Sequence, residues 1–310
     1  MKLNRLIFAS CLLSFDPAFA DEVLPLNEAV ALEFRYQPGR TYESIMTTVA
    51  STNMKMNGQE IKNDQTMTME SDLAVSAIEA SKNVKAAMTY SRVAMEMETM
   101  GQNMGFDSAK PASLEGNPLA GMAGMVGRTV TMTITPDFEV LDLQGLDALF
   151  EGLGAGAEAA QGMVTGDQFK QMMGAQFAAL IPDRKVKSGD EWPYKMSSSL
   201  GPLGIMKASG TNTLKGVLKQ ANSTVAVIDF KATAKSAPGE DQPEGLPEGL
   251  PGMDLGEMKM SGTSHFNLKE GYISKMEMET SMTFSMEIPG GEGKTEVPST
   301  SKMSMTTTMK

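Results

Sequence analysis

Cysteine and histidine are almost absent from this chain of 310 residues, which contains one of each. The cysteine, Cys11, lies in the N-terminal segment, so the rest of the chain has neither a disulfide nor thiol chemistry. The histidine, His265, has no nucleophile motif and no third residue with which to form a catalytic triad. These absences exclude zinc sites built from histidine and cysteine, and they predict a protein that is not an enzyme.

Positive charge is also scarce, because 27 lysine and arginine residues are outnumbered by 38 aspartate and glutamate residues, giving a formal net charge of -11. Nucleic acid and anionic membrane surfaces repel an acidic chain, so neither is expected as a partner. The glycine-rich stretches lack the features of a phosphate-binding loop or of a dinucleotide fingerprint, and no EF-hand loop occurs. The sequence therefore predicts no cofactor and no metal.

The sequence lacks an apolar run long enough to span a membrane. Its N-terminus has a positively charged start, a short apolar run over Leu6–Phe15 and an A-x-A motif at 18–20. This pattern is typical of a cleaved signal peptide at 1–20 and predicts a periplasmic or extracellular protein. A lipoprotein signal, with Cys11 as the lipidated residue, is the alternative.

What the sequence does have is long alternation of apolar and polar residues. Between Met276 and Ile288 the even positions are mostly apolar and the odd positions are polar, which predicts a half-buried β-strand. The stretch 258–268 also alternates, and a short turn at 269–271 joins the two into an antiparallel hairpin. The stretch 84–100 changes its apolar phase after Tyr90, which predicts a β-bulge.

Other elements follow from the same criteria. Strands are predicted at 29–36, 42–56, 59–78, 128–135, 138–143, 192–199, 203–218, 223–235 and 299–309. Helical spacing predicts helices at 145–153 and 167–181. The stretches 101–127 and 236–256 have no period and are predicted to be long loops.

A glycine followed three residues later by a large aromatic residue occurs twice, as Gly39 with Tyr42 and as Gly189 with Trp192. Strands, a long loop and a strand–turn–strand follow each copy, which favours a duplicated module, although meanders of similar strands also look alike. We predict a mainly β fold of two pseudo-repeated antiparallel modules, forming an open barrel or a sandwich, with a helical connector. The predicted divisions are 1–20 for the signal peptide, 21–143, 144–183 and 184–310. Trp192 is expected to be buried with its N–H hydrogen-bonded.

The repeated glycine–aromatic turn, the strand-rich halves and the N-terminal signal resemble a family of uncharacterised secreted bacterial proteins, a domain of unknown function. The resemblance covers most of the chain after the signal, and it implies no activity. At the level of the fold, long antiparallel strands with a helical plug are similar to the half-barrel lipoprotein carriers.

Methionine is abundant, with 29 residues, and Met-x-Met pairs place both thioethers on one face of a strand. Thioethers are soft ligands for Cu(I), but methionine also fills apolar cores and lines surfaces that accept varied apolar ligands. We therefore expect a non-enzymatic envelope protein that binds a lipid or another apolar small molecule in a methionine-lined cleft. The alternatives are a structural or assembly protein of the envelope without a ligand, and a periplasmic Cu(I)-binding protein.

Both long loops contain isolated apolar residues, which a simple tether does not need. We expect these loops to act as lids over the cleft, with disorder of the loops as the alternative. The predicted ligand-binding residues are Met104, Phe106, Met122, Met125, Leu246, Leu250 and Met253. No catalytic residue, metal ligand or oligomeric state is predicted.

Overall fold

The computed structural model describes residues 22–56, 59–153, 166–199, 205–220, 223–237, 253–287 and 294–310. The strands are β1 (Thr41–Met56), β2 (Gln59–Ile78), β3 (Val84–Thr99), β4 (Gln102–Asp107), β5 (Thr129–Ile134), β6 (Val140–Gln144), β7 (Glu191–Ser199), β8 (Ile205–Gln220), β9 (Ser223–Ala237), β10 (Met253–Leu255), β11 (Met258–Asn267), β12 (Tyr272–Glu287) and β13 (Lys294–Met309). The helices are α1 (Leu146–Glu151) and α3 (Gly166–Ala178), with 3-10 turns η1 (Pro111–Ser113) and η2 (Pro118–Met125).

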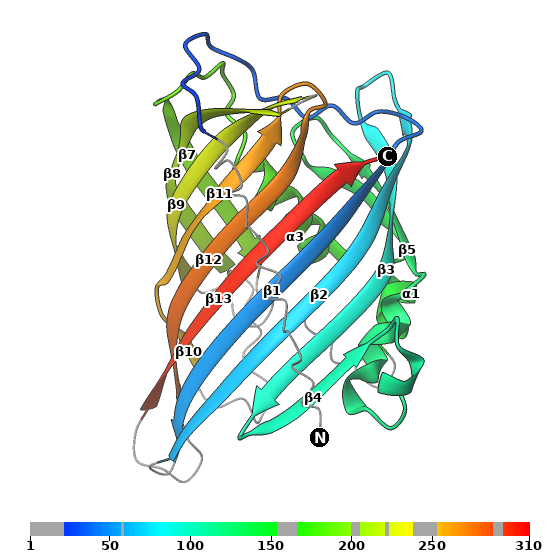
Figure 1. Cartoon of the computed structure of the whole chain (residues 1–310), viewed down its shortest axis with the longest axis vertical. Coiled ribbons are helices and arrows are strands. Elements are labelled where there is room, and N and C mark those ends of the chain that lie inside the picture. Colours follow the sequence, from blue (N-terminus) through cyan, green and yellow to red (C-terminus); the bar gives the residue numbers. More distant parts are fainter. Residues whose placement is uncertain are drawn as a thin grey trace, which may run out of the picture.

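All these strands belong to one antiparallel 13-stranded sheet. The order along the sheet is β6-β5-β3-β2-β1-β13-β12-β11-β9-β8-β7, with β4 paired to β3 and β10 paired to β12. The last strand of the chain, β13, therefore lies in the middle and joins the two halves of the sheet. Figure 1 shows the long central strands as a front wall from which both flanks curve backward. The sheet is open, which confirms the mainly β, open architecture expected from the alternation.

The alternation determines which side chains face the interior. Along β13 the residues from 301 to 309 are alternately half-buried and exposed. The predicted hairpin is formed by β11 and β12, and Gly271 in its turn has φ 69°. The predicted bulge is also present, because the register of β2 and β3 shifts where Glu70 pairs with Arg92 and Ser71 pairs with Tyr90.

Two sequence-based predictions of secondary structure are wrong. Residues 29–36 form no strand apart from a single bridge from Val30 to Val186, although Leu32 is buried and its neighbours alternate in exposure. Alternation in a sequence indicates which side chains are buried, but not whether the backbone pairs with a sheet. In this segment the alternating side chains are buried or half-buried, although the segment is not a strand of the sheet. The stretch 101–127 is not one loop, because it contains β4, η1 and η2. Most of the second predicted loop, 238–252, lies outside the described residues.

The N-terminal segment and α3 fill the concave side of the sheet. Backbone hydrogen bonds hold the N-terminal segment at several places along its length, among them Leu24 with Val217, Val30 with Val186, and the N–H of Arg35 with the carbonyl oxygen of Gly271. Helix α3 contacts both β6 and β7, which are the two ends of the sheet order. The helix thus covers the side on which the sheet does not close.

Two large clusters of buried residues form most of the core, and a third, small cluster consists of Leu218, Val225 and Val227. One large cluster lies on the second half of the sheet and includes Leu180, Trp192 and Phe266. The other lies on the first half and includes Tyr42, Val130 and Phe138. Both lie on the concave side, because the opposite face carries exposed residues such as Ile45 and Val49. No described helix is long and apolar enough to cross a membrane.

Gly39 and Gly189 occupy matching places in the two halves. Their φ angles are 79° and 87°. The N–H of Gly39 donates to the carbonyl oxygen of Val75, and the N–H of Gly189 donates to that of Leu214, each at 2.8 Å. The register shifts directly after Val75 in β2 and directly after Leu214 in β8. These shared details support a duplicated module. The division of the chain into 1–20, 21–143, 144–183 and 184–310 stays a prediction.

Candidate ligand-binding cavity

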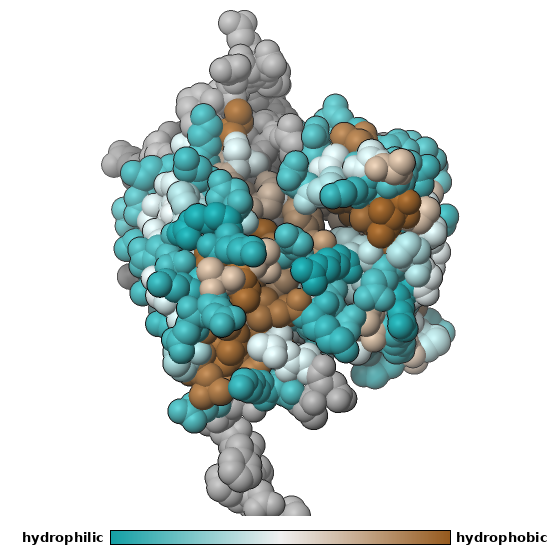
Figure 2. Space-filling view, turned by 90° about the horizontal axis from the view of Figure 1, so that it is seen from above, coloured by the Kyte–Doolittle hydropathy of each residue, from teal (hydrophilic) through white to brown (hydrophobic). Residues whose placement is uncertain are grey.

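A cavity of about 360 Å³ lies between the concave face of the first half of the sheet and α3. Its size is within the range of sites for small organic ligands. Viewed from above, apolar side chains gather in the hollow between polar rims (Figure 2). The cavity is lined by Phe34, Tyr36, Tyr42, Ser44, Met46, Met69, Ser71, Leu73, Met88, Tyr90, Met132, Ile134, Phe138, Val140, Phe169, Met173, Gly174, Tyr272, Ile273, Met305 and Thr307.

Aromatic rings from four separate parts of the chain form one wall of the cavity. The ring of Phe34 meets that of Phe138 edge-on, with centroids 4.2 Å apart. The ring of Tyr42 packs edge-on against Tyr36 at 5.2 Å and against Tyr272 at 5.5 Å. Edge-to-face contacts of this kind fix the orientation of the rings, so this wall is preformed.

Methionines form the floor of the cavity in a row that runs across the strands. Met46 in β1 pairs with Met69 in β2 and with Met305 in β13. Met305 pairs in turn with Met276 in β12. Directly opposite residues of antiparallel strands have Cβ atoms about 4.5–5.5 Å apart, so these thioether side chains are neighbours. They give the floor a flexible, polarizable surface that adapts to varied apolar shapes.

The cavity lining contains no aspartate, glutamate, lysine, arginine or histidine among the described residues. Its titratable groups are tyrosines, and burial raises the pKa of Tyr36, Tyr42 and Tyr90 above the ordinary value. These phenols therefore stay protonated and uncharged at neutral pH. Because a buried charge without a partner is costly, such a cavity suits an uncharged ligand.

Helix α3 covers the cavity through a close backbone contact. Gly174 lies against Phe138, and a Cβ atom at this glycine would overlap the carbonyl oxygen of Phe138. Phe138 has φ 66°, a left-handed conformation that is rare for a bulky residue. The turn that contains it is closed by a hydrogen bond from its N–H to the carbonyl oxygen of Thr135. Phe169 and Met173 of the same helix complete the lining.

The end of α3 is fastened by Asn212 of β8, whose Nδ2 donates to the carbonyl oxygen of Ala179 at 2.9 Å. Asn212 is fully buried and pairs across the strands with Trp192. Within the described part of the chain, neither Oδ1 of Asn212 nor Nε1 of Trp192 has a hydrogen-bond partner. Trp192 is thus buried as predicted, but the predicted hydrogen bond of its N–H is not formed.

Four of the predicted ligand-binding residues, Met104, Phe106, Met122 and Met125, do not line this cavity. Met104 and Phe106 belong to β4, and Met122 and Met125 belong to η2. Met253 is in β10, which pairs with β12, whereas β4 pairs with β3. In the sheet order, three strands, β2, β1 and β13, lie between β3 and β12. Leu246 and Leu250 lie outside the described residues. Among the described ones, the structure does not bring the strand of Met104 and that of Met253 together.

The residues that do line the cavity were visible in the sequence only as the apolar phase of each strand. The strands predicted at 42–56 and 59–78 contain Tyr42, Met46 and Met69, and the helix predicted at 167–181 contains Phe169 and Met173. No local pattern distinguishes a buried face that packs solidly from one that encloses a space. His265 is half-buried in β11 and is not part of the cavity.

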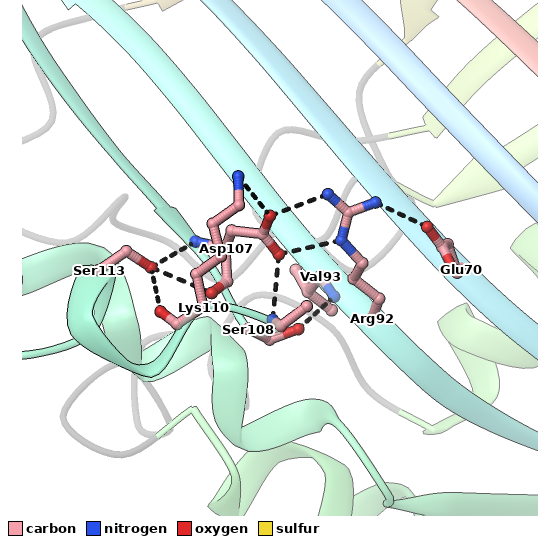
Figure 3. A network of polar contacts seen from close by, with 8 residues as sticks. Glu70, Arg92, Val93, Asp107, Ser108, Lys110 and Ser113 are labelled. Atoms are coloured by element: carbon pink, nitrogen blue, oxygen red, sulfur yellow. Dashed lines mark hydrogen bonds and ion pairs between the residues drawn. The ribbon is translucent and has the colours of Figure 1, made fainter.

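A polar network on the outer face of the sheet fastens β4 to β3 (Figure 3). Two nitrogens of Arg92 donate to the two carboxylate oxygens of Asp107, each at 2.9 Å, and a third donates to Glu70 at 2.7 Å. The bound guanidinium holds the pKa of Asp107 well below its usual range. Lys110 adds an ion pair to Asp107 at 3.2 Å. Because these charged groups satisfy one another, we interpret the network as structural.

We expect Arg92→Ala to lower the free energy of unfolding by about 1–3 kcal/mol, because Asp107, with a 10 % exposed side chain, would lose its main partner. Because the pKa of Asp107 is lowered, its ionised carboxylate stabilises the fold fully above the unfolded-state pKa of about 3.9. This contribution decreases progressively as the pH falls from that value down through the lower pKa of the folded state, so part of it is already lost at pH 3. Urea unfolding of both proteins at pH 7 and pH 3 measures the difference. Lys110→Ala, which removes a 74 % exposed partner, is the control. An equal loss at both pH values would contradict the assignment.

The fold and the cavity define this protein as an open half-barrel whose concave side holds a cavity without charged residues in its described lining. The chain belongs to a family of unknown function (DUF6263), whose profile matches residues 81–288. No protein with curated annotation matches the chain.

Among solved structures, the chain is similar to lipovitellin, in a structure titled for its lipid–protein interactions. The TM-score is 0.51 at 10% sequence identity, and the match covers 89% of this chain and 26% of the lipovitellin chain. The chain thus spans about a quarter of that relative. At this identity the likeness concerns the fold alone.

Two further matches have low TM-scores and carry no argument. DynF from the dynemicin biosynthesis pathway of Micromonospora chersina has a TM-score of 0.19 at 8% identity, with 93% of this chain and 89% of that chain covered. The translocator domain of the autotransporter NalP from Neisseria meningitidis has a TM-score of 0.21 at 9% identity, with 89% and 90% covered.

Proposed function

We propose that this protein is an exported, non-enzymatic carrier that binds an apolar small molecule in the cavity beneath α3. The observation that carries the proposal is the uncharged cavity of about 360 Å³ on the concave face of an open sheet. Its aromatic wall is preformed and its methionine floor adapts, which together suit a lipid-like ligand. The fold likeness to lipovitellin, whose structure was titled for lipid–protein interactions, agrees with this choice.

The proposed location rests on the N-terminal sequence. A positive start, a short apolar run and an A-x-A motif support export to the periplasm or beyond by a signal peptide at 1–20. Lipidation at Cys11 is the alternative. Intact mass analysis of the exported protein distinguishes a chain that starts at Asp21 from one that carries an acylated cysteine.

A periplasmic Cu(I)-binding protein is the second candidate function, because Met46 has a methionine on each side of it. Thioethers suit Cu(I), but the part of the lining that the structure describes carries no anionic group to balance a bound cation. This lack of a counter-charge favours the apolar ligand over the metal.

Native mass spectrometry of protein purified from its own envelope, followed by titration with the neutral dye Nile red, tests the carrier function. We expect a retained apolar molecule and, after delipidation, saturable one-to-one binding of the dye with a blue shift of its emission. Saturable binding of Ag(I) as a mimic of Cu(I), with no dye binding, would favour the metal. Absence of both would overturn the carrier function and support a structural protein of the envelope.

A further inference from the structure

We propose that the ligand of this cavity is an uncharged amphiphile whose single hydroxyl or carbonyl group binds to a short polar row formed by Ser71, Ser44 and Thr307. This inference rests on the proposed carrier function and names the chemical class of its ligand.

The polar row crosses the floor of the cavity from strand to strand. Ser44 in β1 pairs with Ser71 in β2 on one side and with Thr307 in β13 on the other. Ser71 pairs in turn with Tyr90 in β3. All four side chains line the cavity. Since neighbouring strands in a sheet lie about 4.8 Å apart, the row places hydroxyl groups side by side on three adjacent strands.

The row has hydrogen-bonding capacity that the protein does not use. The hydroxyls of Ser44 and Thr307 are 3.0 Å apart, so one of them donates to the other and one donor is left over. The hydroxyl of Ser71 has no hydrogen-bond partner in the described parts of the chain. The raised pKa of Tyr90 keeps its phenol protonated and able to donate. A ligand oxygen at this place could accept from two or more hydroxyls.

The rows on either side of this one are apolar. Toward the aromatic wall, Tyr42 pairs with Leu73. Toward the other end of the strands, Met46 lies between Met69 and Met305. Ser44, Ser71 and Thr307 are the serine and threonine residues among the described residues of the lining. Apart from the tyrosine hydroxyls, the described lining therefore offers one localised row of hydroxyl groups within an apolar surface, which matches a long apolar molecule with a single polar group.

The absence of charged residues in the described lining determines which kind of polar group the ligand can carry. A carboxylate or an ammonium group placed on this row would lose its hydration and gain no opposite charge, which costs several kcal/mol. A hydroxyl or carbonyl group loses less hydration and regains it through hydrogen bonds. A fatty acid would therefore bind in its protonated form, and its affinity would rise as the pH falls toward and below the ordinary carboxyl pKa of about 4.

The test compares decanol, decane and decanoic acid as competitors of Nile red, on the full chain and on the variant Ser44→Ala/Ser71→Ala/Thr307→Val. A single hydrogen bond contributes about 1–1.5 kcal/mol, which corresponds to roughly a tenfold change in affinity. We expect the variant to bind decanol about tenfold more weakly than the wild type and to bind decane unchanged. We expect the wild type to bind decanoic acid more tightly at pH 4 than at pH 8.

The control is Ser304→Ala/Thr306→Val, which removes two hydroxyls from the exposed face of β13. It is expected to bind all three competitors as the wild type does. Equal loss of decanol and decane affinity in the cavity variant, with an intact circular dichroism spectrum, would overturn the polar row but leave the carrier function standing. Tighter binding of decanoic acid at pH 8 would also overturn the proposed ligand class. Failure of every competitor to displace the dye from the wild type would instead overturn the carrier function.

Discussion

Ser304→Pro is expected to remove most of the cooperative stability of this protein. Ser304 lies in β13, where it pairs with Thr47 of β1 on one side and with Glu277 of β12 on the other. A strand paired on both sides uses each backbone N–H, and proline has none to offer. Because β13 alone joins the two halves of the sheet, the defect falls where no other strand compensates. We expect a loss of about 3 kcal/mol or more in the free energy of unfolding.

Urea unfolding followed by circular dichroism measures this effect, and Ser304→Ala is the matched control. The side chain of Ser304 is exposed, so the alanine variant should stay within about 0.5 kcal/mol of the wild type. If the proline variant were as stable as the alanine variant, β13 would not be the strand that holds the halves together. A chain that stops before residue 294 should show the same defect in stronger form.

Ser71→Phe is expected to abolish ligand binding while the protein stays folded. The side chain of Ser71 points into the cavity between Ser44 and Tyr90, so a phenyl ring there would occupy the space that a ligand needs. We expect the affinity for Nile red to fall by about 100-fold or more, equivalent to roughly 2.8 kcal/mol. The midpoint of unfolding should stay the same or rise, because the ring fills an apolar space.

The matched control is Ser304→Phe, which places the same ring on the exposed face of the sheet. Isothermal titration with Nile red compares the two variants with the wild type. Wild-type affinity in a folded Ser71→Phe protein would show that the dye binds elsewhere. A loss of affinity in both variants would show that the ring acts on the fold and not on the cavity.

The elements that the sequence predicted best are those whose burial alternates along one strand. The hairpin of β11 and β12 and the bulge near Tyr90 were predicted correctly. Successive side chains of a strand point to opposite faces, so the positions of the apolar residues show which face is buried and where that face changes. The same reasoning failed at 29–36. There Leu32 is buried by packing across the concave side, and the described pairing of the segment is limited to the isolated bridge between Val30 and Val186.

The candidate site was less predictable, because its residues come from strands and segments far apart in the chain. Tyr36, Met173 and Met305 meet in one cavity, although over a hundred residues separate each from the next. The sequence-based search for a binding surface instead favoured isolated apolar residues in the two unpatterned stretches. Met125 of this set packs beside the core cluster of the first half, so its apolar character has a structural reason.

The repeat shows why equivalent positions differ in role. Tyr42 is near the start of β1 and lines the cavity, whereas its counterpart Trp192 is near the start of β7 and lies in a core cluster with Leu180. Residues 179–181, just after α3, pack on the second half of the sheet, while Phe169 and Met173 cover the first half. The position of one helix therefore leaves a cavity over one copy of the module and packs residues 179–181 against the other.

The sequence by itself determined the strand-rich class, the faces of the strands, the scarcity of chemistry based on cysteine and histidine, and the repeated turn at Gly39 and Gly189. These follow from local periodicity and from residue type, which act within a few residues of each other. Tertiary structure alone decided that β13 lies between β1 and β12, that α3 covers the open side, and that Ser44, Ser71 and Thr307 form one row. Pairing between distant strands depends on the packing of the whole chain, which no local pattern records.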